Sequence, residues 1–252
     1  MDPKPASGGG TEAALANQWE IQRRRRIWMV LVGWDTHMAA VLGRPTNVDA
    51  ELAADPTLPV DAVMPLFPSA TGGGHDYRTT TPVVPRSETE DPPTFLTKQL
   101  WIHRLMAPLR EVLALEKYGP CPRDSFARVD ALHQRMVEVE AAIPAWFRAA
   151  NPDTTYDHLP EMYWLPYVRP QLPQLAAFNF MALHRPYVYT RRKSRTEALR
   201  ACLGMLKAQR HHFSTLRPHQ YKMFVFFFFF PLFLSLSLSL SLSFSSCRDN
   251  EY

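Results

Sequence analysis

The chain has 252 residues, of which 46% are hydrophobic and 21% charged, so it is long enough for one sizeable core or two small ones. Its formal net charge of +4 is mildly basic, which is compatible with a nuclear protein but does not require a nucleic-acid partner. The three cysteines lie far apart and form no C-x-x-C pair, so the sequence indicates neither a disulfide framework nor a structural zinc site.

Residues 1–11 form a polar, glycine-rich lead that we expect to be flexible and that has no signal-peptide pattern. Asn17 and Glu20 have capping-box spacing and predict the start or restart of a helix that runs to about Leu42. Gly43 is expected to end it in a left-handed conformation, and Pro45 prevents its continuation. Apolar residues at helical spacing predict its buried face: Ile27, Leu31, Trp34, Met38, Val41 and Leu42.

A loop-dominated stretch follows from Thr46 to Pro93, and it holds many of the chain's 23 prolines. Thr94 is then expected to cap a second helix, which Pro108 should kink and Gly119 should close. The predicted core residues of this helix are Leu96, Leu100, Leu105, Leu109, Val112 and Leu113.

Three further helices are predicted after that. Asp124 or Ser125 should cap the first, whose buried seam comprises Val129, Leu132, Met136, Val139 and Ile143. A loop over 151–170 precedes a helix over about 171–183. Ser194 and Glu197 form a second capping box, and the last helix is predicted to bury Leu199, Leu203, Leu206 and Phe213. No strand pattern precedes the tail, so the predicted fold class is all-α, an irregular helical domain with long Pro-rich loops.

The tail from Met223 to Cys247 has no charged residue and would be long enough to cross a membrane. Its five consecutive phenylalanines and its strict Leu-Ser alternation match one translated pyrimidine repeat, and the alternation has strand periodicity, which suits no single membrane span. We therefore expect residues 12–222 to form the helical domain and 223–252 to be a low-complexity artefact of the gene model. The alternative is a C-terminal membrane anchor.

The segment RRRRIWMVLVGWDTHMAAVLGRP resembles the middle homology region of fungal zinc-cluster transcription factors, the fungal-specific transcription factor domain. That family shows R-R-R-[IV]-W, an Asp about two turns later, and then L-G-R-P. The matching residues are Arg24, Arg25, Arg26, Ile27, Trp28, Asp35, Leu42, Gly43, Arg44 and Pro45. Leu58-Pro59 matches the L-P of the following loop.

The stretch FNFMALHRPYV resembles the family's L-H-R-P segment, with Leu183, His184, Arg185 and Pro186 in place. Together the similar pieces span about 18–222, in the family's order. Met29, Thr36 and Ala39 depart from residues that are frequent there. The family's six-cysteine zinc cluster and the early helices of its middle region have no counterpart, so the chain looks like the second half of the regulatory domain.

The resemblance implies a nuclear protein that regulates DNA-templated transcription. It implies DNA binding and zinc only through the absent N-terminal cluster, and no cofactor in this chain. Its partners would be co-regulator proteins or a small effector; a homodimer stays open, and a membrane partner is not favoured. The alternative is a helical interaction protein that does not bind DNA and that is either soluble or anchored by its tail.

The motif residues themselves favour structural roles. On a helix, Arg23 to Arg26 point in all directions, so they cannot all face one DNA groove, and we expect a solvated helix end. Arg25 and Asp35 are about 15 Å apart along the axis, so any pairing must involve another helix. We expect Arg44 to hydrogen-bond loop carbonyls, and His184 and Arg185 to complement a helix dipole.

No motif predicts an enzyme: G-x-S-x-G, the P-loop, G-x-G-x-x-G and H-E-x-x-H are all missing, and no nucleophile or acid pairs with His184 in sequence. His211-His212 is predicted to be a surface pair. Most tryptophans are predicted to pack in the core or between helices, with an effector pocket as the alternative: Trp28, Trp34, Trp101, Trp146 and Trp164.

Overall fold

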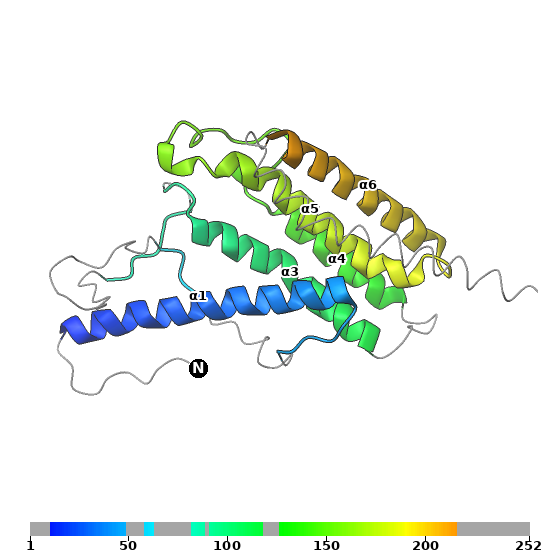
Figure 1. Cartoon of the computed structure of the whole chain (residues 1–252), viewed down its shortest axis with the longest axis horizontal. Helices are drawn as coiled ribbons and strands as arrows, with labels where there is room; N and C mark the ends of the chain where they lie inside the picture. The colour runs from blue at the N-terminus through cyan, green and yellow to red at the C-terminus, as the bar shows by residue number, and fades with distance from the viewer. Residues whose placement is uncertain (1–10, 49–57, 63–81, 89–90, 118–125, 216–252) are drawn as a thin grey trace, which may run out of the picture. The chain divides into compact units, whose positions relative to one another are not determined.

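A computed structural model describes residues 11–48, 58–62, 82–88, 91–117 and 126–215 (Figure 1). Its α-helices are α1 (Thr11–Leu42), α3 (Phe95–Lys117), α4 (Phe126–Ala141), α5 (Leu165–His184) and α6 (Arg192–Thr215). Three short 3-10 turns are η2 (Ala145–Phe147), η3 (Pro160–Met162) and η4 (Arg185–Tyr187). Within these described ranges there is no strand, so the predicted all-α class is confirmed.

The chain divides into two compact units. The first comprises residues 1–35 and 47–106, and the second comprises residues 36–46 and 107–252. The divisions fall within α1 and α3, so each of these helices contributes to both units. The predicted low-complexity tail, the caps at Asp124 or Ser125 and the closing Gly119 lie outside the described residues.

Helix α1 begins at Thr11, so Asn17 lies within it and the predicted capping box is wrong. The predicted end is confirmed, because Gly43 follows Leu42 with a φ of +63°. The Arg44 N–H donates to the Ala39 carbonyl over 3.0 Å, which is the long bond of a Schellman cap. Gly43 is thus in the left-handed region that favours glycine.

The predicted buried face of α1 is wrong. Ile27, Leu31, Trp34, Met38 and Leu42 are between 42% and 58% exposed, and Val41 is half-buried. The buried residues lie on another face, at steps of three, four and seven: Trp19, Gln22, Met29, Val32, Thr36 and Ala39. This buried face carries large apolar side chains as well as small and polar ones, and the row that contains Ile27, Leu31 and Trp34 lies at the surface.

Helices α3 and α4 follow the predicted pattern more closely. Thr94 caps α3, because its Oγ1 accepts from the N–H groups of Leu96 and Thr97. Pro108 lies inside α3, as expected. The buried residues of these helices include the predicted Leu96, Leu105, Leu109, Val112, Val129, Leu132 and Met136, whereas Leu100, Leu113 and Val139 are half-buried.

Helix α5 begins at Leu165, inside the stretch predicted to be a loop. Its Pro170 and Pro173 each remove a backbone donor, so this helix lacks two of its regular hydrogen bonds. Burial offsets this loss, because Leu165, Val168 and Leu172 are at most 1% exposed. The buried Arg169 also fixes this part of the helix. Its guanidinium makes a bidentate pair with Asp157, with N–O distances of 2.6 and 2.7 Å.

Helices α5 and α6 form a hairpin in the second unit, and Figure 1 shows them side by side. His184 bonds to Ser194 near the turn, and Gly204 lies opposite Ala177 further along, which fixes an antiparallel register. A Cβ added at Gly204 would lie 3.8 Å from that of Ala177.

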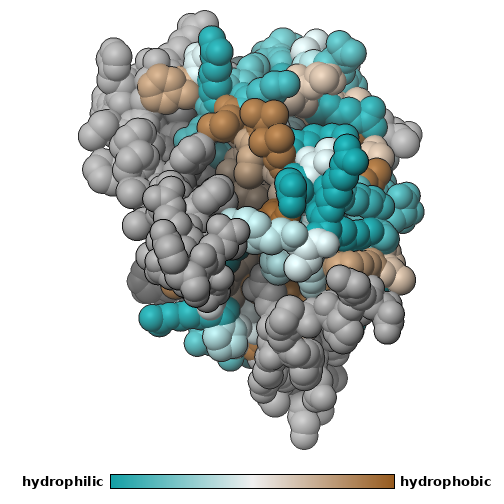
Figure 2. All heavy atoms as spheres, turned by 90° about the vertical axis from the view of Figure 1, so that its right-hand side faces the viewer, coloured by the Kyte–Doolittle hydropathy of each residue, from teal (hydrophilic) through white to brown (hydrophobic). Residues whose placement is uncertain are grey.

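The predicted buried face of α6 is also wrong. Leu199, Leu203, Leu206 and Phe213 are between 43% and 62% exposed, whereas Ser194, Ala198, Ala201 and Met205 are buried. Small side chains therefore occupy most of the buried face of α6, and the leucines lie outside. Figure 2 looks onto the side of the chain where α5 turns into α6, and hydrophobic residues lie there at the surface among hydrophilic ones.

Of the helices that the structure describes, none combines the length and the apolar composition that are needed to cross a bilayer.

Measurements of stability can test which face of α6 is buried. We expect Met205→Ala to lower the free energy of unfolding by about 2–5 kcal/mol, because it removes a buried side chain. Leu206→Ala, at the adjacent exposed position, should change it by less than about 0.5 kcal/mol. Urea denaturation of both variants measures the difference, and equal losses would contradict the assignment of the buried face.

Candidate functional site

The first two arginines of the family-like segment form ion pairs within α1. Arg24 is exposed and pairs with Glu20 of the same helix over 2.8 Å, and Arg23 pairs with the same carboxylate. Both arginines are solvated, as expected, but they lie well inside α1, which begins at Thr11, so the predicted helix end is wrong. These two arginines thus pair within their own helix, whereas the hydrogen-bond partners of Asp35 lie in the loop after α1.

Arg25 and Arg26 are half-buried. Burial lowers the pKa of Arg26, and attraction to the Asp61 carboxylate partly offsets that shift. The arginine run thus has an exposed pair and a half-buried pair, and one of its members lies within electrostatic reach of a loop acid.

Asp35 holds the chain that follows the helix. Its Oδ1 accepts from the backbone N–H and the side-chain amide of Asn47, at 3.1 and 2.7 Å, and its Oδ2 accepts from the N–H of Val48 at 2.9 Å. Desolvation alone would raise the pKa of Asp35, but these hydrogen bonds outweigh it and the pKa is lowered. The acid of the motif therefore closes the L-G-R-P turn onto α1.

The side chain of Arg44 makes no hydrogen bond to any described residue, so its predicted contact with loop carbonyls is wrong; its backbone N–H forms the cap instead. Pro45 is exposed and directs the chain away from the helix.

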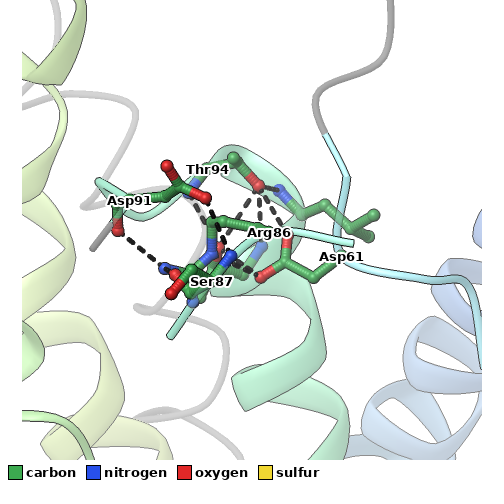
Figure 3. A network of polar contacts seen from close by, with 7 residues as sticks. Asp61, Arg86, Ser87, Asp91 and Thr94 are labelled. Atoms are coloured by element: carbon green, nitrogen blue, oxygen red, sulfur yellow. Dashed lines mark hydrogen bonds and ion pairs between the residues drawn. The ribbon is translucent and has the colours of Figure 1, made fainter. Parts of the chain in front are cut away.

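A polar network around Asp61 joins three segments of the first unit (Figure 3). Asp61 follows Leu58-Pro59, and the N–H of Val60 donates to Gln22 of α1 over 2.7 Å. The Asp61 carboxylate accepts from Arg86 Nε at 3.0 Å, from Thr94 Oγ1 at 2.9 Å and from Thr97 Oγ1 at 2.7 Å. One acid thus connects the L-P loop, the 82–88 segment and the N-terminus of α3.

Arg86 is the buried cation of this network, with a side chain that is only 4% exposed. Its NH1 donates to the carbonyls of Ser87 and Asp91, and its backbone N–H donates to the Asp61 carbonyl over 2.7 Å. Figure 3 shows Arg86 between Asp61 and Asp91. Sequence analysis missed both Asp61 and Arg86, because they are 25 residues apart in proline-rich segments without periodicity.

The L-H-R-P segment ends α5 in the second unit. Leu183 and His184 are buried, whereas Arg185 and Pro186 are exposed and begin the turn η4. His184 Nε2 lies 2.9 Å from His133 Nδ1, and His184 Nδ1 lies 3.1 Å from Ser194 Oγ. The predicted capping role of Ser194 is therefore wrong: the residue lies in the first turn of α6 and its hydroxyl bonds to His184.

Ser194, His184 and His133 are hydrogen-bonded in a chain, as in a catalytic triad, but the serine and His184 are closed off from solvent. Ser194 and His184 are both 0% exposed, so no substrate can reach the hydroxyl. Desolvation, together with repulsion from His133, lowers the pKa of His184 to about 4. His184 is neutral at pH 7, so it does not complement the helix dipole as a cation. Its role is to connect α4, α5 and α6.

The tryptophans differ in how far they are buried. Trp101 and Trp164 are buried, as predicted, and Trp146 is half-buried. Trp28 and Trp34 are 41% and 48% exposed, so their predicted place in the core is wrong. His211 is exposed, as predicted, and the side chain of His212 lies outside the description. Over the part of the chain that the structure describes, no group of three or more metal-ligating side chains comes together.

These contacts make Asp35 and His184 parts of the scaffold, and α1 keeps an exposed apolar face. No family model matches the chain, and neither a curated protein nor a solved structure does. The resemblance to the fungal transcription factor domain therefore rests on the short motifs alone.

Asp61 should be essential to the first unit. Asp61→Ala leaves the buried Arg86 guanidinium without its carboxylate and removes an acceptor from two threonines, so we expect a loss of about 3–5 kcal/mol in the free energy of unfolding. Glu111→Ala breaks an exposed ion pair with Arg135 and should cost less than about 1 kcal/mol. Chemical denaturation compares the two, and a similar small loss for both would refute the role of Asp61.

His184 should make stability depend on pH. Its folded pKa of about 4 lies below the ordinary value of 6.5, so the unfolded chain binds more protons between these values. Stability is therefore highest above pH 6.5 and falls towards pH 4, by about 2 kcal/mol at pH 5 from this residue.

His184→Gln, which does not titrate, should flatten this dependence, whereas His158→Gln at an exposed position should leave it in place. Denaturation at several pH values gives the slopes, and NMR titration of the unchanged protein follows the imidazole directly. A His184 signal that titrates near pH 6.5 would contradict the expectation.

Proposed function

We propose that this chain is the regulatory, or middle homology, region of a fungal zinc-cluster transcription factor and that it acts in regulation of DNA-templated transcription. It would work in the nucleus through contacts with other proteins. DNA binding would belong to a zinc-cluster module outside this chain, since the three cysteines here cannot supply that module's six thiolates.

The observation that carries the proposal is that the R-R-R-I-W segment turns an arginine inwards and its apolar residues towards the solvent. Arg26 is half-buried within reach of Asp61, whereas Ile27 and Trp28 are 53% and 41% exposed. Leu31 and Trp34 extend this exposed row by further helical steps. Large apolar and aromatic side chains gathered on one exposed face are typical of protein interfaces.

Two acidic residues further along the chain support this reading because they hold the scaffold together. Asp35 closes the loop after α1, and Asp61 joins the next loop to α3. These contacts use the polar atoms internally, which favours a binding scaffold over an acid–base site. The buried Ser194 and His184 favour the same conclusion, because a substrate has no access to them.

A tethering assay tests the proposal. The full chain is fused to the DNA-binding module of an unrelated repressor and expressed in a fungal host with a matching reporter gene. We expect the fusion to change reporter transcription relative to the module alone. The double variant Ile27→Ser/Leu31→Ser should abolish this change, because it removes apolar contacts from an exposed face without opening the core.

The matched control is Val84→Ser/Tyr163→Ser, which alters two exposed apolar residues elsewhere and should keep the effect. A normally expressed fusion that leaves the reporter unchanged would contradict the proposal. Recovery of the chain in the membrane fraction would favour the anchored interaction protein instead.

A further inference from the structure

Helix α6 carries an exposed row of leucines that the hairpin does not use. Leu199, Leu203 and Leu206, called the leucine row below, are 62%, 51% and 43% exposed. At about 100° per residue they fall within a sector of about 60° on the helix surface. The opposite face packs against α5 through buried residues such as Ala198 and Ala201, so the hairpin forms without the leucine row.

Cations lie at both ends of the leucine row. Arg192 precedes the row and Arg210 follows it. Each points within about 20° of the direction of Leu199, and the two are about 27 Å apart along the helix axis. Lys207 lies beside the second end. All three are exposed, and none of them forms an ion pair with a described residue.

Two of the other cations of α6 form ion pairs: Lys193 pairs with Asp130, and Arg200 pairs with Glu197 over 2.6 Å. Arg195, about 40° from Leu199, donates from Nε to the Val188 carbonyl and adds a further positive charge near the first end of the leucine row. Glu197 is the one acid among the 24 residues of α6, and it points about 160° away from Leu199. The surface around the leucine row is therefore apolar in the middle and positive at its ends, with no acid on the same face of the helix.

This pattern disfavours two other occupants. A helix that lies on a lipid surface keeps its cations on the polar side, whereas Arg192 and Arg210 lie in the middle of the apolar sector. A second copy of α6 would place arginine beside arginine in either direction, which is repulsive.

The charges fit a helix that has acidic residues at its ends and apolar residues between them. We propose that the leucine row, bounded by Arg192 and Arg210, binds an acidic amphipathic helix of a partner protein. The leucines supply the apolar contact, and the two arginines set the position of the bound helix along α6. This site is separate from the exposed face of α1 and does not depend on the proposed function.

Binding of designed peptides to the full chain tests the proposal. The first peptide, of about 20 residues, is helical, has leucines at helical spacing and glutamates at both ends. The second has lysines in place of the glutamates, and the third has serines in place of the leucines. By fluorescence anisotropy we expect the first to bind at least about tenfold more tightly than either of the others, and more weakly as salt is added.

Variants of the chain locate the site. Leu203→Ser and Arg192→Glu/Arg210→Glu should each weaken binding of the acidic peptide by about tenfold or more. Arg128→Glu, which reverses an exposed cation on α4 that has no ion pair among the described residues, should leave the affinity unchanged. Circular dichroism confirms that the variants fold, which is expected because the altered side chains are exposed.

Three results would overturn the proposal: no saturable binding of the acidic peptide, equal binding of the lysine peptide, or no loss with the α6 variants. Vesicles of phosphatidylserine and phosphatidylcholine test the lipid alternative. Tighter adsorption to vesicles than to the peptide, lost in Leu203→Ser, would assign the face to a membrane surface instead.

Discussion

Close packing of α5 against α6 requires small side chains between the two helices, and this constraint decides the surface of the second unit. Ala177 faces Gly204, and Ala198 and Ala201 lie on the buried face of α6. Because the small residues must face inwards, the larger leucines of α6 face outwards. The same register brings Ser194 to His184 and buries both. The hairpin therefore produces the polar link at its turn and the exposed apolar row along its outer face.

The first unit relies on polar contacts where the second relies on helix packing. Its loops contain many prolines, which offer few regular backbone hydrogen bonds. The Asp61 carboxylate compensates by accepting from one arginine and two threonines, and Gln22 fixes the same loop to α1. A buried acid and arginine are costly to desolvate, but mutual pairing and several hydrogen bonds satisfy them. The L-P loop is thus held at α1 without an apolar core of its own.

Both units use several polar motif residues, such as Asp35 and His184, in structural contacts and leave apolar helix faces at the surface. This distribution is the basis of the proposed role in recognition of other proteins. The face of α1 is rich in aromatic residues, whereas the leucine row of α6 is bounded by cations. The chemistry of the two faces therefore differs, and separate variants test the two proposals.

The sequence by itself determined the all-α class, the end of α1 at Gly43, the cap at Thr94 and the buried seam of α4, because each depends on local geometry or on one clear periodicity. It could not decide which face of α1 or α6 is buried, since the exposed face of each helix is itself apolar and repeats with helical spacing. The neighbouring helix decides which face is buried, and α5 selects the face of α6 that has small side chains. The Asp61–Arg86 pair and the His133–His184–Ser194 chain also needed tertiary structure, because their members are brought together from separate segments whose proximity no local pattern encodes.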